Sequence, residues 1–391
     1  ILRIGSRRAL DLLALHATNG RMRYDDVRNH VLQRGSTLES LGWLAGGTVD
    51  PEMVVRIARV AVLQAHEESD KPDGLQILEW VYRQEGWAPF RPDHARLFQN
   101  IAFDLGEFEL ANSLAASIKG SRLDALIMKA DLANPHGPSS FADEGEWMRT
   151  FARLFQRDGL EVPSLLSVDT SEPFDRLACL PDVAITDGPL VSIIVTSWQP
   201  GEGLETAIRS LMNQSWRNLE ILLVDDASPA SYLPILNRVV ALDPRIKLIR
   251  LEQNGGTYQA RNHGLRAATG EFVTGQDSDD WSHPRRIEKQ VKVLLKSRHR
   301  ISTTSHALRC DPALTFNAPG TQARRENASS LMFRRTEVLE RVGFYDATRK
   351  GGDTEYMLRI RRVFGEKSHR TLEHNLALIR QTRGSLSTAE F

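Results

Sequence analysis

Several features are scarce or missing in this chain of 391 residues, and each absence excludes a class of protein. Only Cys179 and Cys310 are present, too few for a disulfide framework or a thiolate zinc site, and this usage fits a reducing cytosol. Lys plus Arg equals Asp plus Glu at 50 each, so no bulk charge attracts nucleic acid. No apolar run is long enough to span a bilayer, and no basic-then-apolar leader follows Ile1. We therefore expect a globular protein of the cytoplasm, either free or peripheral at the inner face of the membrane.

The first part of the chain, residues 1–134, has the apolar periodicity of successive amphipathic helices. Before the segment Pro51 to Gln64, Asp50 suits an N-cap. Ala95 to Gly106 and Phe108 to Ala115 resemble a tetratricopeptide-type hairpin, although the repeat period is irregular. We expect an all-α helical-hairpin domain that binds a protein partner, associates with itself or simply caps the chain. The expected helices are Arg7 to Thr18, Pro51 to Gln64, Leu75 to Tyr82, His94 to Leu105, Phe108 to Ile118 and Leu123 to Ala133.

Residues 135–188 are expected to form a helix and a linker. The helix is predicted from about Ala142 to Gln156, because Trp147, Phe151 and Leu154 recur at helical spacing. The stretch from 161 to 188 is rich in proline and acidic residues, which predicts a linker packed on the domain that follows.

From Pro189 to the end, residues 189–391, short apolar runs alternate with helical segments, which predicts an α/β domain. This alternation favours a mainly parallel sheet with flanking helices, and such sheets bind ligands outside the carboxyl ends of their strands. Polar residues stand at these ends: Thr196 and Ser197, Asp225 and Asp226, and Asp277 with Asp279. The expected strands are Leu190 to Val195, Leu219 to Val224, Ile246 to Leu251 and Glu271 to Thr274, and the helices between them are Leu204 to Asn213, Leu233 to Leu242 and Tyr258 to Ala268.

The acidic stretch Asp277-Ser278-Asp279-Asp280 follows the apolar run 272–274. If that run is a strand, Asp277 and Asp279 point to the same side, because strand side chains alternate. Such a carboxylate pair suits Mg²⁺ or Mn²⁺ that also holds phosphate oxygens. The alternative is an acidic turn, since Asp and Ser are common turn residues.

Six motifs of this domain occur in the order found in family 2 glycosyltransferases, and the chain resembles that family over residues 189–364. The resemblance implies a GT-A fold, a nucleotide-diphosphate sugar donor with a UDP-sugar as first candidate, and Mn²⁺ or Mg²⁺. A nucleotidyltransferase is disfavoured, because Thr196-Ser-Trp-Gln-Pro200 stands where its glycine-rich loop would be. The motifs are Val191-Ser-Ile-Ile-Val-Thr196, Ser210-Leu-Met-Asn-Gln214, Glu220-Ile-Leu-Leu-Val-Asp-Asp-Ala-Ser228, Asn254-Gly-Gly256, Ala260-Arg-Asn-His-Gly264 and Asp277-Ser-Asp-Asp280.

The resemblance assigns roles on the donor side. Asp226, together with Asp225, accepts hydrogen bonds from the ribose and the base, unless Asp225 only caps the next helix. Thr196 and Ser197 line the base pocket or simply end a strand. Arg261 contacts the nucleotide or forms a salt bridge on its helix.

The Asp-x-Asp element of the family corresponds to Asp277 and Asp279. Asp279 is the expected direct metal ligand, and Asp277 is a second ligand that also lies near the sugar and the ribose. Asp280 binds a hydroxyl of the acceptor or donor, or merely turns the chain. Arg285 and Arg286 assist the diphosphate or are exposed residues of a first helical turn.

On the acceptor side, Gly351-Gly-Asp-Thr-Glu-Tyr356 resembles the acidic element that supplies the catalytic base. Asp353 takes the base position, with the N-cap of the following helix as its alternative role. Glu355 is the second candidate base. The family usually has an acidic residue where this chain has Gly352, which is a departure.

The last segment, from Ile379 to Ser387, resembles the part of the family that closes over the diphosphate. Arg380, Arg383 and Ser385 are its candidate phosphate or acceptor contacts, unless the segment is a mobile tail. The histidines His306 and His374 are either further metal ligands or structural residues.

These expectations combine into one function. The chain is expected to be an inverting, metal-dependent hexosyl- or N-acetylhexosaminyltransferase that acts on a hydroxyl of a saccharide, lipid-linked or polyol-phosphate acceptor in bacterial cell-surface polysaccharide synthesis. The competing hypothesis is a catalytically inactive, transferase-like scaffold whose helical domain binds partners.

Overall fold

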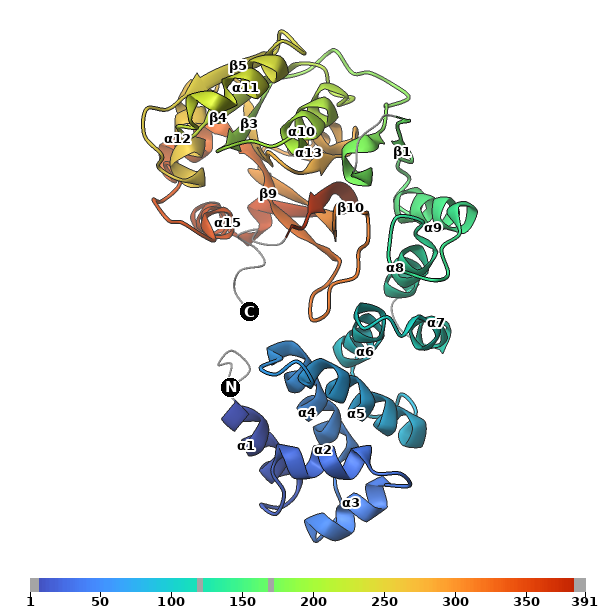
Figure 1. Ribbon diagram of the computed structural model, residues 1–391. Helices are drawn as coiled ribbons and strands as arrows, with labels where there is room; N and C mark the ends of the chain where they lie inside the picture. The colour runs from blue at the N-terminus through green and yellow to red at the C-terminus, as the bar shows by residue number, and fades with distance from the viewer. Residues whose placement is uncertain (1–6, 118–121, 168–171, 383–391) are drawn as a thin grey trace. The chain divides into compact units, whose positions relative to one another are not determined.

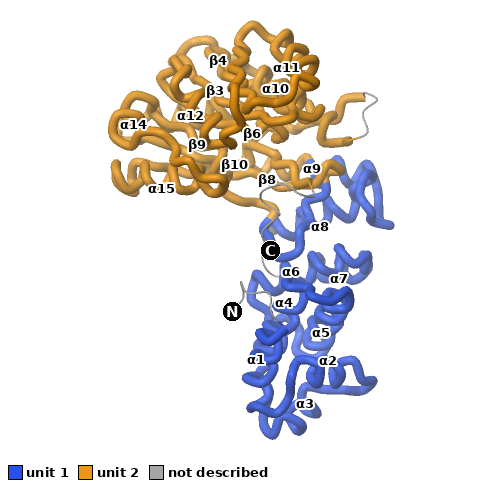
Figure 2. The backbone as a smooth tube through the Cα atoms, turned by 60° about the vertical axis from the view of Figure 1, so that its left-hand side comes forward, with its two compact units in different colours: residues 1–151, 315–322, 387–391 blue, residues 152–314, 323–386 orange. Residues whose placement is uncertain are grey.

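The computed structural model describes residues 7–117, 122–167 and 172–382. The chain forms two compact units, one made of residues 1–151, 315–322 and 387–391 and the other of residues 152–314 and 323–386 (Figure 2). The first unit is helical, and the second contains an eight-stranded sheet flanked by helices. The three-part division at residues 134 and 188 stays a prediction.

One apolar core of the first unit contains residues of the helices α1 to α8. Helix α4 begins at Pro51, and the carboxylate of Asp50 accepts from Glu52 N at 2.9 Å, which is the predicted N-cap. Helices α4 and α5 approach closely at Gly74, where a Cβ would lie 2.5 Å from a methyl group of Val62. The helices are α1 (Arg7–Ala17), α2 (Tyr24–Leu32), α3 (Leu38–Ala45), α4 (Pro51–Gln64), α5 (Asp70–Glu85), α6 (Pro92–Asp104), α7 (Phe108–Ser117), α8 (Arg122–Ala133) and α9 (Glu144–Gln156), of which α2 and α3 had not been expected individually.

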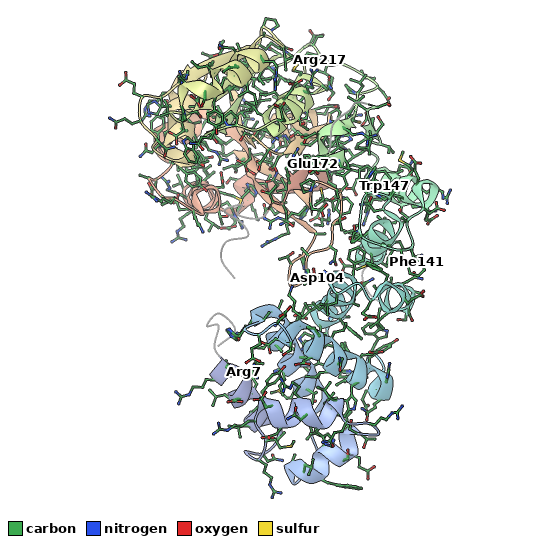
Figure 3. All side chains as sticks on the ribbon, in the orientation of Figure 1. Arg7, Asp104, Phe141, Trp147, Glu172 and Arg217 are labelled. Carbon is green, nitrogen blue, oxygen red and sulfur yellow. The ribbon has the colours of Figure 1, made fainter. Side chains whose placement is uncertain are left out.

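Arg7, labelled in Figure 3, joins three helices of this unit. Its guanidinium lies 2.7 Å from Asp25 of α2 and 3.4 Å from the buried Asp70 at the start of α5. The pairing compensates the buried charge of Asp70, which alone would be costly in this apolar core.

The sheet of the second unit is mixed, with strand order β5-β4-β3-β6-β9-β8-β10-β7. Strands β5, β4, β3 and β6 are parallel, as the alternation of strands and helices predicts, whereas β9 runs antiparallel to β6 and β8. The strands of the sheet are β3 (Val191–Ser197), β4 (Leu219–Asp225), β5 (Ile246–Arg250), β6 (Phe272–Asp277), β7 (Trp281–Ser282), β8 (Ser302–Cys310), β9 (Arg324–Arg334) and β10 (His369–Arg380); β1 (Ser164–Leu165) and β2 (Leu177–Ala178) pair separately.

Helices cover both faces of this sheet (Figure 1). In β3, Val191, Ile193 and Val195 pack toward α10, α11 and α13, while Ile194 packs toward α12 and the C-terminal helices. Burial on both faces explains why the strand is apolar throughout. These helices are α10 (Gly203–Met212), α11 (Leu233–Val240), α12 (Thr257–Ala267), α13 (Arg286–Leu295), α14 (Arg335–Arg341) and α15 (Gly352–Phe364).

The α/β class, the flanking helices and the all-helical first part are confirmed, and the predicted strands end within three residues of the observed ones. Strands β8, β9 and β10 were missed, because β8 carries Ser, Thr and His at many positions and lacks an apolar pattern. Their polar groups are satisfied by neighbouring strands instead: Ser305 N, for example, donates to Ser330 Oγ at 2.9 Å. Among the residues that the structure describes, no helix has the length and apolarity needed to cross a membrane.

Glu220 joins the amino-terminal ends of the central strands. Its carboxylate accepts from Ser192 Oγ at 2.6 Å, from Lys247 at 2.8 Å and from the backbone and hydroxyl of Thr269. Burial alone would raise the pKa of Glu220, but these hydrogen bonds outweigh it and lower the pKa to about 2. A group with a depressed folded-state pKa stabilises the protein above its unfolded pKa, and this stability is lost as pH falls through the folded value.

We predict that Glu220→Gln lowers the free energy of unfolding at pH 7 by about 2–3 kcal/mol, because the donors lose a charged acceptor. The difference from the wild type should shrink as pH falls from about 4.5 toward 2, the window between the ordinary and the depressed pKa. Urea unfolding at several pH values measures both effects. Glu337→Gln, on the exposed side of α14, is the control for the loss of one charge; equal effects of the two changes would contradict the prediction.

Candidate active site

The carboxyl ends of β3, β4 and β6 meet at one edge of the sheet. In the parallel registers, Thr196 lies beside Asp277 and Ser197 lies beside Asp225. The predicted polar residues of these strand ends are therefore neighbours. Ser197 Oγ is buried and has no hydrogen-bond partner among the described residues.

Asp225 and Asp226 follow each other at the end of β4 but have different surroundings. Asp225 is buried and accepts from Arg250 Nε at 3.0 Å; the cap positions of the next helical segments, Pro229 and Tyr232, have no side-chain cap, so Asp225 does not have that alternative role. Asp226 accepts from the backbone N–H groups of the two glycines 255 and 256 at 2.9 and 2.7 Å. Asp226 thus fixes the loop from which α12 starts.

A single guanidinium on α12 holds two carboxylates of the candidate site. Arg261 is buried, its Nη2 lies 2.8 Å from Asp277 Oδ1, and its Nη1 donates to Asp353 Oδ1. Gly275 lies close to this guanidinium, but a Cβ there would crowd the carbonyl of Ser329 at 2.9 Å and would only touch the guanidinium carbon at 3.8 Å. Arg261 therefore forms the salt bridge that the sequence left as an alternative, and it joins the carboxylate at the end of β6 to the one at the start of α15.

Asp353 is the second residue of α15 and not its N-cap, which is Gly351 and has no side-chain cap. Its other oxygen accepts from Tyr258 Oη at 3.2 Å. A Cβ at position 352 would lie 2.7 Å from the Tyr258 ring. The departure from the family pattern at Gly352 is thus explained by the ring of Tyr258, which occupies that space and orients Asp353.

The acidic stretch after β6 concentrates negative charge. Asp279 lies at the surface, but the protein around its carboxylate limits solvation. This desolvation and the charge of Asp277 raise the pKa of Asp279 to about 6. Asp280 is buried, and burial together with Asp277 and Asp279 raises its pKa well above the ordinary value. This charge excess and these hard oxygen donors fit a divalent cation that takes further ligands from a substrate. Within the described ranges, the protein itself brings no group of three or more potential ligands together.

Asp280 and Arg380 are neighbours at the ends of β7 and β10. Asp280 Oδ1 accepts from Arg380 N at 3.0 Å, and Arg380 Nε donates to the carbonyl of Asp279 at 3.2 Å. The Arg380 guanidinium pairs with Asp175 and lies over the ring of Phe174 at 4.3 Å. Arg380 is thereby held against the acidic stretch, whereas Arg383 and Ser385 lie outside the described residues.

The two arginines of the next helix are not exposed, so that alternative was wrong. Arg286 is buried behind the acidic stretch, donates to Gly275 O at 3.1 Å, and burial lowers its pKa to about 10. Arg285 pairs instead with Glu161 and Glu288. Of these two arginines, Arg286 is the one whose charge acts on Asp277 and Asp280.

The remaining candidates have structural partners. Glu355 is held by both ends of the Arg359 fork at 2.8 Å, within its own helix, whereas Asp353 contacts Arg261 and Tyr258. The charged groups that face His306 include Glu373 and Arg324, and none belongs to the acidic stretch. The same holds for His374.

Sequence reasoning missed several residues that shape the site. Tyr258, Arg250 and Asp175 are ordinary helix, strand and linker residues in the sequence, and only the tertiary contacts reveal them. Trp198 was noted only as part of a strand end, yet its ring is exposed directly beyond Ser197. Because Trp198 follows the end of a predicted strand, its position in the sequence could have indicated a residue of the site.

We predict that Arg261→Met destabilises the protein by about 3 kcal/mol, because Asp277 and Asp353 lose their shared cation. Arg261→Lys is the matched control: it keeps the charge, but one ammonium does not reproduce a fork that spans two carboxylates, so its stability should fall between those of the other two proteins. Thermal and urea unfolding measure the order. Wild-type stability of both variants would show that the bridge contributes nothing.

Comparison with known proteins finds similarities in the sheet-containing part of the chain. Residues 192–353 match the family model described as Glycosyl transferase family 2. An uncharacterized glycosyltransferase of Haemophilus influenzae is 37% identical over 123 residues, covering 32% of this chain and 49% of that protein. In Bacillus subtilis, the putative glycosyltransferase EpsE is 41% identical over 116 residues (29% and 42%) and the putative teichuronic acid biosynthesis glycosyltransferase TuaG is 34% identical over 120 residues (31% and 48%). The chain spans about half or less of the length of these curated relatives.

Two solved structures are also similar. One is the mannosyltransferase PcManGT of Pyrobaculum calidifontis in complex with GDP-Man and Mn²⁺, with a TM-score of 0.40, 20% identity and coverage of 52% of this chain and 61% of that one. The other is residues 1–349 of S. aureus TarS in complex with UDP-GlcNAc, with a TM-score of 0.43, 17% identity and coverage of 51% and 61%. The family match and the curated relatives agree with the motifs, and residues 192–353 are therefore a glycosyltransferase family 2 domain.

Proposed function

We propose that the chain is an inverting, metal-dependent glycosyltransferase that moves a sugar from a nucleotide-diphosphate sugar to a hydroxyl of a saccharide, lipid-linked or polyol-phosphate acceptor. The observation that carries the proposal is the position of Arg261, whose guanidinium holds Asp277 and Asp353 at the same time. One carboxylate stands beside the donor-side strand ends and the other at the start of α15. Sugar transfer needs carboxylates in both places.

The donor pocket is proposed at the edge formed by β3, β4 and β6. Ser197 Oγ offers a free hydroxyl there, the exposed ring of Trp198 suits stacking on a base, and Asp226 retains lone pairs beside the glycine loop. Asp279 and Asp277 are the proposed ligands of Mn²⁺ or Mg²⁺. When bound, the ion neutralises charge on the departing nucleotide diphosphate. Thr196 and Asp225 line the pocket behind these residues, and a UDP-sugar is the first candidate donor.

Asp353 is the proposed catalytic base. Inversion by direct displacement requires one carboxylate to accept the proton of the acceptor hydroxyl as the new bond forms. Arg261 and Tyr258 occupy one site on each Asp353 oxygen and so fix its orientation, while further lone pairs stay available to the acceptor. Asp280 and Arg380 are proposed to border the acceptor and the diphosphate.

The proposed biological setting is bacterial cell-surface polysaccharide synthesis, with a hexose or N-acetylhexosamine as the transferred sugar. The similarity to TuaG, which is named for teichuronic acid biosynthesis, supports this setting. A cytoplasmic or peripheral location and a protein partner for the first unit stay predictions.

A panel of nucleotide sugars tests the function, with thermal unfolding and release of nucleoside diphosphate as the two readouts. We predict that at least one donor raises the unfolding midpoint in the presence of Mn²⁺, because ligand binding stabilises the native state. Asp279→Asn should reduce metal-dependent release of the nucleoside diphosphate by about 10²–10⁴, since the ion loses a ligand.

Without metal, Asp279→Asn should unfold no earlier than the wild type, because this carboxylate is already destabilised by burial and by Asp277. Asp187→Asn, in an exposed loop, is the matched control and should leave turnover unchanged. Undiminished turnover in Asp279→Asn would refute the metal assignment. A wild-type chain that binds and consumes no nucleotide sugar would favour the inactive scaffold.

The base assignment is tested by comparing two neutralised carboxylates of the same helix. Asp353→Asn should lower the rate of transfer to an acceptor by about 10²–10⁴ while donor binding persists, because the proton acceptor is lost. Glu355→Gln should have a much smaller effect, since Glu355 pairs with Arg359 of its own helix and not with the guanidinium that also holds Asp277. The transfer rates of both variants are measured under single-turnover conditions. A larger loss of rate in Glu355→Gln than in Asp353→Asn would assign the role of the base to Glu355.

A further inference from the structure

Two arginines stand side by side on the antiparallel strands β8 and β9. Ala307 pairs with Arg325, and Arg309 N donates to the carbonyl of Ala323 at 2.8 Å, two residues before Arg325. In an antiparallel pair, directly opposed residues share a face and so do residues two apart. Arg309 and Arg325 therefore project from the same face of the sheet as diagonal neighbours.

Among the residues that the structure describes, these two guanidinium groups have no counter-ion. In the described part of the chain, no carboxylate lies at ion-pair distance from either of them. Arg309 is only partly exposed; burial and the charge of Arg325 lower its pKa, and Asp280 only partly offsets them. Arg324, which points to the opposite face, is satisfied: it donates to Asn375 and pairs with Glu373. Arg325 is exposed to solvent, but Arg309 is partly buried, and an unpaired cation there is costly unless an anion joins it.

The arginine pair lies beside the candidate active site. On the neighbouring strand β10, Ile379 pairs with Arg309. The next residue, Arg380, donates its backbone N–H to Asp280 Oδ1. The charge of Asp280 acts on Arg309. The pair is thus next to the acidic stretch on the side away from β3 and β4, where the donor pocket is proposed.

A polar strip leads from the pair toward the proposed base. Asn327 lies two residues beyond Arg325 on the same strand face, opposite Ser305. Ser329 follows, and its hydroxyl and its backbone N–H both donate to Asn327 Oδ1. The carbonyl of Ser329 is 2.9 Å from the place of a Cβ on Gly275, which also borders Arg261. Polar groups therefore continue from Arg325 to the guanidinium that holds Asp353.

We propose that Arg309 and Arg325 form an anion-binding subsite for the acceptor, which carries a phosphate or a carboxylate near the hydroxyl that reacts. This inference rests on the proposed function, because it places the acceptor on the Asp353 side of the sheet. Guanidinium groups present paired donors that match both oxyanions. A neutral acceptor would leave both cations unpaired.

The test uses the full chain and four probes, arranged as two matched pairs: glycerol 3-phosphate with glycerol, and glucuronate with glucose. Binding is measured by ligand-observed NMR titration at low ionic strength. We expect at least one anion to bind and its neutral partner not to bind, and the identity of that anion distinguishes a phosphate from a carboxylate. Arg309→Ala with Arg325→Ala should weaken this binding at least tenfold.

The control is Arg298→Ala with Arg370→Ala, which removes two exposed cations of the same unit and should leave anion binding unchanged. An equal loss in this control, or equal binding of neutral and anionic probes, would overturn the subsite. The donor panel is run on the same proteins. If the arginine variant loses donor binding, the pair holds the donor diphosphate and the inference fails. If no nucleotide sugar binds to the wild type while the anion still requires the pair, the transferase proposal fails and the subsite remains.

Discussion

The guanidinium of Arg261 is the interaction on which the candidate site depends. Asp277 comes from the end of a central strand and Asp353 from a helix about 75 residues later, and like charges repel unless a cation separates them. Arg261 supplies this cation from a buried position, with one nitrogen for each carboxylate. Its helix starts at the glycine loop that Asp226 holds. The positions of the three aspartates are therefore coupled through a single helix.

Tyr258 and Gly352 show how a departure from the family pattern fits this arrangement. An acidic side chain at position 352 would add a third negative charge next to Asp353 and would collide with the Tyr258 ring. With glycine there, the phenol reaches Asp353 and donates to it. The ring of Tyr258, on α12, thus occupies the space of the missing carboxylate. Asp353 is the carboxylate of this segment that contacts Arg261. The hydrogen bond from Tyr258 to Asp353 supports the proposal that Asp353 is the catalytic base.

The parallel half of the sheet was predictable, because strands buried on both faces must be apolar and their links must be helical. Ser197, Asp225 and Asp277 followed from the rule that ligands bind at the carboxyl ends of such strands. The antiparallel half was not predictable, because β8 satisfies its hydroxyl groups through partners far away in the sequence, such as His369 and Ser330. For the same reason the sequence did not reveal Asp175, which holds Arg380 from a segment expected to be a linker. Local patterns report burial, whereas ion pairs between distant segments depend on the finished fold.

The charges around the acidic stretch explain why a divalent cation suits this site. The guanidinium of Arg261 is shared by two carboxylates, and that of Arg380 forms an ion pair with Asp175. The guanidinium of Arg286 donates to the backbone carbonyl of Gly275. Burial and the charge of Asp277 raise the pKa of Asp279, and the charge of Arg380 offsets this only in part. A further arginine would bring bulk and fixed donors into the space that a diphosphate needs. A small divalent ion at the proposed site would instead add two charges and could take carboxylate and phosphate oxygens together.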